Sequence, residues 1–382
     1  MATRGRPSKD INEDQVLALK TIGFKWKEIA DLIGVSDRTL RTRRKEFTQE
    51  ILTYDVINDY ELDNIIQDIL EDSPNSGERM ITGALLSKSI KVKRQRVRES
   101  LDRVNPNRQS LSRRITRRVY NVASPNALWH MDGFHKMIRW RLVIHGCIDG
   151  YSRLITFLNC SNNNRADTVL NLFIGSLNRF RCPLRIRSDH GMENTSVARW
   201  MLENLGVDKK PFITGRSVHN QRIERLWVDV KGYVASLFID LFRAMETDGL
   251  LDIDDELHLF CLHFVFIPRI NRLLNEFSSS WNNHPLRTEK NMTPNQLWSR
   301  GFLESETLVD DTSLVDENYG IDDFGPEPEL QTNNNIEIPE IENPLTEEEE
   351  QYIIDHFVPL ENDGNYGINI YTQLLEYLSN LE

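Results

Sequence analysis

The spacing of apolar positions divides the chain into segments of different predicted structure. Between residues 11 and 47, apolar side chains recur three and four residues apart, which predicts three short helices. A second helical unit is predicted over about 55–108, where Leu62 and Ile66 begin an apolar helix face. Over 125–302 the pattern changes to short apolar runs between turn residues, so we predict strands followed by helices and strands in alternation.

The apolar runs of this third segment predict five strands and the helices that cover them. We expect strands at 128–131, 142–148, 154–160, 184–188 and 210–214. We expect helices at 165–180, 196–205 and 219–242, and an additional helical insertion at about 238–280. The first three strands should form an antiparallel meander. Strands first and then alternating elements indicate an α/β (α+β) layer with helices on a sheet.

Two segments before this layer resemble helix-turn-helix units. Residues 26–40 place a glycine at the turn and Ser36 as N-cap of a polar helix, and residues 79–101 give a similar pattern. The candidate DNA contacts are the basic residues of these units, Arg38, Arg41, Arg43, Arg44, Lys91, Lys93, Arg94, Arg96 and Arg98. The alternative is a pair of small helical units with solvated basic faces. Within 1–50, Arg4-Gly5-Arg6 resembles an AT-hook, although a disordered basic arm explains it equally well.

The charge is unevenly distributed along the chain. The whole chain carries −12, but residues 303–382 contain 22 acidic and no basic side chains, which leaves +10 for residues 1–302. Residues 76–120 contain 13 basic and three acidic side chains, including a basic linker over 109–124. This density predicts salt-dependent binding to double-stranded DNA. The acidic tail is expected to be largely disordered, with helices at about 345–357 and 368–381. It is either solvated or a docking or DNA-mimicking segment.

Several classes of protein are disfavoured by the composition. The four cysteines are too widely spaced for a zinc ribbon and too few for a disulfide framework. The first residues lack the apolar stretch of a signal peptide, and no run of 18 apolar residues occurs. We therefore expect a soluble intracellular protein with no membrane partner and no organic cofactor.

Three acidic residues stand in local sequences typical of a phosphoryl-transfer site. Asp132 lies in a predicted strand, Asp189 ends another strand before a His-Gly turn, and Glu224 begins a predicted helix. Two carboxylates at strand ends and one on a helix match what a two-metal site requires, because Mg²⁺ and Mn²⁺ prefer oxygen ligands. We expect strand alternation to direct His130 and His135 to the face opposite Asp132, which makes them poor candidates as metal ligands.

Residues 127 to about 300 resemble the integrase core of retroviral integrases and many transposases, a ribonuclease-H-like fold. The motifs that carry the resemblance are the three acids, Asp149-Gly-Tyr-Ser-Arg153, Ser188-Asp-His-Gly191, Trp281 to Pro285 and Thr293 to Trp298. The whole arrangement is most similar to eukaryotic transposon-derived proteins with an integrase core domain. The resemblance implies that Asp132, Asp189 and Glu224 are catalytic and bind two Mg²⁺ or Mn²⁺ ions. It also implies that Lys231, two helical turns after Glu224, contacts DNA; we predict further DNA contacts at His190 and Asn220.

The implied activity is metal-dependent cleavage of a phosphodiester at a transposon end, followed by strand transfer into target DNA. A homo-oligomer and, in a eukaryote, a nuclear location are expected with it. The absence of histidine from residues 1–129 excludes the His/Cys zinc domain of retroviral integrases from that segment. Two alternatives stay open: a domesticated DNA-binding protein that retains the fold, and a ribonuclease-H-like nuclease. Without cations the three carboxylates should repel one another and have raised pKa values.

Overall fold

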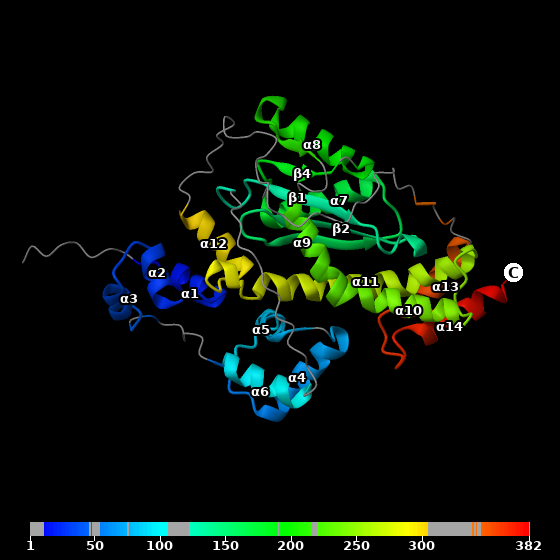
Figure 1. The fold of residues 1–382 in the computed structure, drawn as a ribbon, viewed down its shortest axis with the longest axis horizontal. Helices are drawn as coiled ribbons and strands as arrows, with labels where there is room; N and C mark the ends of the chain where they lie inside the picture. The colour runs from blue at the N-terminus through cyan, green and yellow to red at the C-terminus, as the bar shows by residue number, and fades with distance from the viewer. Residues whose placement is uncertain are drawn as a thin grey trace, which may run out of the picture.

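The structure is a computed structural model of the 382-residue chain. It describes residues 11–45, 47, 54–74, 76–105, 122–189, 191–215, 220–304, 338–339, 341 and 345–381. The predicted AT-hook-like arm, most of the basic linker and the acidic stretch 305–337 lie outside the described residues. Figure 1 shows a mixed sheet on one side of the long helix α11, with the helical unit α4–α6 on the other side.

The described residues form a five-stranded sheet in the order β3-β2-β1-β4-β5. The strands are β1 (Trp129–Phe134), β2 (Val143–Asp149), β3 (Ile155–Ser161), β4 (Ile186–Ser188) and β5 (Phe212–Thr214). The first three pair antiparallel, which confirms the predicted meander. Strands β4 and β5 add in parallel on the other side of β1. The central position of β1 places its middle residue, Asp132, next to both halves of the sheet.

Helices cover both faces of the sheet, so it is an α+β layer as predicted. Helices α7 (Ala166–Phe180) and α8 (Thr195–Leu205) cover the face to which Trp129 and Met131 point. Helix α9 (Gln221–Val230) covers the opposite face through Ile223 and Trp227. Short 3-10 turns complete this region at Ile138–Trp140, Met192–Asn194, Val207–Lys209 and Arg287–Glu289.

The predicted insertion is helical. After α9 the chain continues through a π-helical turn (Lys231–Ala235) into α10 (Ser236–Thr247), and α11 (Glu256–Asn283) follows. Within the described part of the chain, α11 is the one helix long and apolar enough to cross a membrane. Its buried residues, among them Phe266 and Leu274, pack into the main core with α9, α10 and β3. We therefore interpret α11 as a core helix.

The amino-terminal helices are α1 (Glu13–Ile22), α2 (Trp26–Leu32) and α3 (Asp37–Arg43). Ser36 caps α3 as predicted, because its Oγ accepts a hydrogen bond of 3.1 Å from the backbone N–H of Thr39. This unit lies beside α12 (Pro294–Glu304), where Gln296 donates a 3.4 Å hydrogen bond to the carbonyl of Ile22. Figure 1 shows α1 and α2 beside α12.

The second helical unit consists of α4 (Asp59–Asp72), α5 (Glu78–Ser87) and α6 (Arg94–Val104). Helix α5 lies directly against the end of α11 at Gly83. A Cβ atom at this position would lie 2.2 Å from the carbonyl oxygen of Ser280, so only glycine permits the approach. The unit is therefore attached to the core by a close helix–helix contact.

The end of the acidic tail is part of the core. Helices α13 (Glu347–His356) and α14 (Ile368–Ser379) form where helices were predicted. Ile370, Tyr371 and Leu374 of α14 are buried in the cluster that contains α10 and α11, and the Tyr371 hydroxyl donates a 3.1 Å hydrogen bond to the carbonyl of Leu250. The two predicted helices are confirmed, but the expectation of a solvated tail is wrong for residues 345–381, because their apolar helix faces pack into the core.

Candidate active site

The three predicted acids lie around β1 and the end of β4. Asp132 lies in β1, Asp189 directly follows the parallel neighbour β4, and Glu224 lies in the first turn of α9. Burial, and after it repulsion from both Asp189 and Glu224, raises the pKa of Asp132, so the three carboxylates lie within electrostatic reach of one another. Asp189 and Glu224 follow Asp132 by 57 and 92 positions in the sequence. The parallel pairing of β1 with β4 and the packing of α9 on β1 bring the three acids near one another.

Asp132 is fixed from the α9 side. The indole N–H of Trp227 donates a 2.7 Å hydrogen bond to Oδ2 of Asp132. The indole lies over Gly146, which pairs directly with Asp132 across β1 and β2. From the sequence alone, Trp227 is interpreted only as a core or interface anchor of the predicted helix. Its position three residues after Glu224, on the same helix face, was the available signal for a role at the site.

Asp189 is held by the turn that follows it. Its Oδ1 accepts 3.2 Å hydrogen bonds from the backbone N–H of Gly191 and from the side chain of Asn194. Glu193 is buried beside this turn, and burial and then repulsion by Asp189 raise its pKa. Glu193 is an acidic neighbour of the site that sequence reasoning missed, because nothing in the turn sequence marks it as buried.

The electrostatic strain expected of the acids is present for two of them. Burial, and after it repulsion by Asp189, raises the pKa of Glu224 to about 7, while Lys136 opposes the shift. Burial is also the largest cause for Asp132, whose pKa lies well above its usual range although the Trp227 hydrogen bond opposes the shift. Both raised pKa values confirm the expectation that these carboxylates disfavour full ionisation without cations.

The donor set fits hard divalent cations, although the acids are not drawn together around one point. Among the described residues, no three His, Cys, Asp or Glu side chains form a group that could hold a metal ion as they stand. Burial, and after it repulsion from Asp189 and Glu224, raises the pKa of Asp132. A divalent cation would remove that repulsion, and carboxylate oxygens are the ligands that Mg²⁺ and Mn²⁺ prefer. Binding therefore requires the three side chains to approach one another.

The residues predicted to contact DNA near the acids differ in accessibility. Lys231 is exposed and lies seven residues after Glu224, on the same side of the helix. His190 lies outside the described residues. Asn220 is buried: its side chain donates a 2.8 Å hydrogen bond to the carbonyl of Met131 and lies 2.8 Å from Nδ1 of His130. Asn220 is thus placed to position β1 against the start of α9, and its burial does not support a direct DNA contact.

The expected orientation of His130 is wrong. Residues two apart in a strand share a face, so His130 points to the same side of β1 as Asp132 and bonds to Asn220 near α9. It is fully buried, and burial lowers its pKa to about 3, which keeps the ring neutral.

The basic side chains of α3 are largely accessible. Arg38 and Arg41 are exposed, and Arg41 lies 3.7 Å from Asp37 in its own helix. Arg44 stacks over the ring of Trp26 at 4.8 Å. Arg43 is half-buried. The DNA-binding role of these four arginines stays a prediction.

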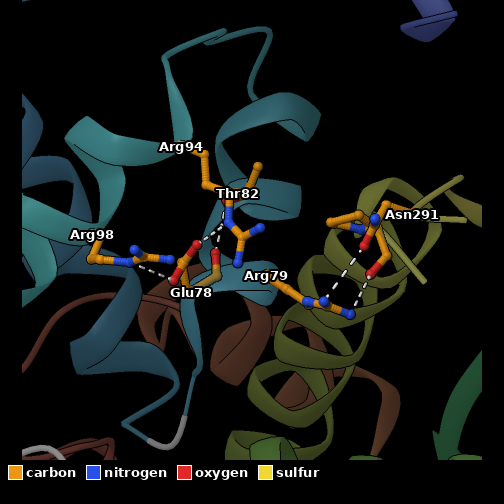
Figure 2. A network of polar contacts seen from close by, with 7 residues as sticks. Glu78, Arg79, Thr82, Arg94, Arg98 and Asn291 are labelled. Atoms are coloured by element: carbon orange, nitrogen blue, oxygen red, sulfur yellow. Dashed lines mark hydrogen bonds and ion pairs between the residues drawn. The ribbon is translucent and has the colours of Figure 1, made fainter. Parts of the chain in front are cut away.

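The basic side chains of α6 are paired with acids from neighbouring helices. Figure 2 shows Glu78 of α5 between Arg94 and Arg98, with both of which it forms ion pairs. Arg96 pairs with Asp59 of α4 at 2.5 Å. Residues 54–105 contain ten acidic and eight basic side chains, so the unit as a whole is not basic. The count over 76–120 omitted the acids of α4, which precede that window in sequence but pack beside α6.

The two lysines before α6 lie near an aromatic ring. The ammonium groups of Lys91 and Lys93 are 5.8 and 5.9 Å from the ring centre of Tyr54. Lys93 is exposed and Lys91 is half-buried. Of the five candidate contacts in this unit, Lys93 is exposed, and within the described residues its ammonium group forms no ion pair with an acid.

Comparison with known proteins decides the family. A family model described as "Integrase core domain" matches residues 119–312, about half of the chain. This chain belongs to the integrase core domain family. The mixed sheet with α9 on one face and α7 and α8 on the other is therefore the integrase core, and the fold predicted from the acidic motifs is confirmed.

Solved structures similar to this integrase core include two from retroviruses. The HTLV-2 integrase catalytic core domain, solved with magnesium in a trimeric form, is 15% identical over 46% of this chain and 97% of that chain, with a TM-score of 0.30. The simian T-cell lymphotropic virus intasome, in complex with PP2A regulatory subunit B56 gamma, is 13% identical over 63% of this chain and 73% of that chain, with a TM-score of 0.38. Among curated proteins, none matches this chain.

Proposed function

We propose that this protein is a transposase or integrase-like enzyme that cleaves phosphodiester bonds at the ends of a mobile DNA element and joins them to target DNA. The observation that carries the proposal is the convergence of Asp132, Asp189 and Glu224 in an integrase core, where burial and then repulsion between the acids raise the pKa values of Asp132 and Glu224. Carboxylates are rarely gathered in this way unless a cation or a reaction requires it.

Each residue of the site has a role in this proposal. Asp132, Asp189 and Glu224 would hold two Mg²⁺ or Mn²⁺ ions, which when bound neutralise charge on the attacked phosphate and activate the attacking oxygen. Trp227 orients Asp132, and Asn194 orients Asp189. The exposed ammonium group of Lys231, on the Glu224 side of its helix, would attract the phosphate backbone of the bound strand.

The partners proposed are double-stranded DNA and further copies of the chain. The helical units α1–α3 and α4–α6 would read the element ends as helix-turn-helix modules, and family membership supports a homo-oligomer as the active form. In a eukaryotic host the proposed site of action is the nucleus.

A strand-transfer assay with the element's own terminal repeats tests the proposal. We expect joining of labelled ends to target DNA with Mg²⁺ or Mn²⁺, and loss of joining in Asp189→Asn with DNA affinity changed less than about twofold, because one uncharged isostere leaves the phosphate contacts in place. Asp208→Asn, an exposed acid outside the site, is the matched control and should be active. Full activity of Asp189→Asn would contradict the site assignment.

Two other outcomes would replace the proposal. Sequence-specific binding of the wild-type protein with neither cleavage nor joining would indicate a domesticated DNA-binding protein. Metal-dependent cleavage of DNA or RNA without joining would indicate a ribonuclease-H-like nuclease.

A further inference from the structure

The indole of Trp227 connects two of the three acids of the site. It belongs to α9, as does Glu224, and its N–H donates a 2.7 Å hydrogen bond to Oδ2 of Asp132 in β1. Residues three apart on a helix share a face, so Glu224 and Trp227 both face β1. One hydrogen bond thus joins the helix that carries one acid to the strand that carries another.

The surroundings of the indole allow it one position. Gly146, opposite Asp132 in β2, provides the space: a Cβ atom there would lie 2.5 Å from Cη2 of Trp227 and 2.7 Å from a methyl group of Leu158. Phe134, two residues after Asp132 and on the same face of β1, packs against the indole with ring centres 5.6 Å apart. Trp227 is itself only 5% exposed. Packing therefore fixes the ring, and the ring fixes the carboxylate.

We infer that Trp227 is a positioning residue that orients the Asp132 carboxylate for a divalent cation and sets its separation from Glu224. Indole N–H is a donor only, so the bond uses acceptor capacity of Oδ2 and fixes the orientation of the Asp132 carboxylate, to which the backbone N–H of Gly133 also donates. The donor also partly offsets the repulsion that Asp132 experiences from Asp189 and Glu224. Outer groups that orient metal ligands in this way typically contribute tenfold to hundredfold in metal affinity. The inference rests on the proposed function.

The test measures Mn²⁺ binding directly, from the electron paramagnetic resonance signal of free Mn²⁺, with full-length protein and no DNA. Trp227→Phe removes the N–H and should weaken Mn²⁺ binding by about tenfold or more. Replacing Trp227 by benzothienylalanine keeps the two-ring shape and exchanges N–H for sulfur, so it should cause the same loss with little change in stability. Trp200→Phe, a tryptophan of α8 packed against Phe173 away from the acids, is the matched control and should bind normally.

A double-mutant cycle separates orientation of Asp132 from a general loss of packing. In an Asp132→Asn background, Trp227→Phe should weaken residual Mn²⁺ binding by less than about twofold, because the residue acts through Asp132. Wild-type affinity in the folded benzothienylalanine variant would overturn the inference and leave the proposed function intact. If the wild-type protein has no Mn²⁺ site that is lost in Asp189→Asn, both the inference and the proposed function are overturned.

Discussion

Replacement of Glu224 by glutamine should stabilise the protein at alkaline pH in the absence of divalent cations. In the folded state the pKa of Glu224 is about 7, raised from an ordinary value of 4.5 by burial and by Asp189. A raised carboxyl pKa means that ionisation of this group is less favourable in the folded chain than in the unfolded chain. The wild-type protein is therefore free of this penalty below about pH 4.5 and loses stability as the pH rises through 7. Glutamine keeps the size of the side chain and never ionises.

The expected stabilisation by Glu224→Gln follows from the pKa shift of Glu224. One pKa unit corresponds to about 1.4 kcal/mol, so a shift from 4.5 to about 7 corresponds to about 3 kcal/mol at most. Partial contact of Glu224 with solvent reduces this, and we expect Glu224→Gln to raise the free energy of unfolding by about 2 kcal/mol at pH 8. For a core of this size that gain raises the melting temperature by roughly 4–8 °C. Near pH 4.5 the variant and the wild type should be equally stable.

Chemical denaturation monitored by circular dichroism, in chelator and at half-unit steps from pH 4.5 to 8.5, measures the difference. Glu203→Gln, which removes an exposed carboxylate from α8, is the matched control and should follow the wild type at every pH. Addition of Mg²⁺ at pH 8 should stabilise the wild type and reduce or reverse the advantage of Glu224→Gln, because the cation relieves the repulsion that the substitution removes. A stability difference that does not change between pH 4.5 and 8.5 would refute the electrostatic reasoning about the site.

Three further substitutions test other parts of the structure. Glu78→Gln should release two arginines of α6 and tighten DNA binding severalfold at low salt, as measured by an electrophoretic mobility assay. The control Glu61→Gln, which removes an exposed acid of α4, should change the affinity less. Equal effects of the two substitutions would show that net charge alone matters. Tyr371→Ala should destabilise the core by about 3–5 kcal/mol in denaturant unfolding, and a change below about 1 kcal/mol would mean that α14 does not complete the core. Gly83→Val should detach the α4–α6 unit from α11, seen as faster proteolysis between the units, while unchanged proteolysis would contradict the close contact.

Much of the integrase core was predictable because its signals are local. Each strand of the sheet coincides with an apolar run bounded by turn residues, and the acids were recognised because each occurs at a strand end or helix start with a characteristic neighbourhood. Alternation within β1 also determines which face of the sheet Asp132 occupies. The prediction for His130 was wrong because residues two apart in a strand point to the same face and not to opposite faces.

What could not be predicted depends on contacts between distant segments. The charge of the α4–α6 unit was misjudged because Asp59 and Glu78 neutralise arginines that a one-dimensional count treats as free. The apolar periodicity of the tail predicted its two helices, but their packing into the core was missed because the partner surface on α11 lies far away in the sequence. The burial of Asn220 likewise follows from its contact with β1, some 90 residues earlier.

The distribution of rigid and adjustable parts around the acids indicates how the site would operate. Asp132 is held by a buried indole and Asp189 by two donors of its turn, whereas Glu224 has Lys136 as an opposing charge and a pKa near neutrality. The two strand acids are therefore oriented by fixed donors, and Asp132 and Glu224, whose pKa values are both raised, are the members whose ionisation a cation would complete. Binding of the ions should accordingly release protons near pH 7 and strengthen as the pH rises through that value. Calorimetric titration of Mg²⁺ in buffers of different ionisation enthalpy would measure this release, and a proton count of zero at pH 6.5 would show that Glu224 is not among the ligands.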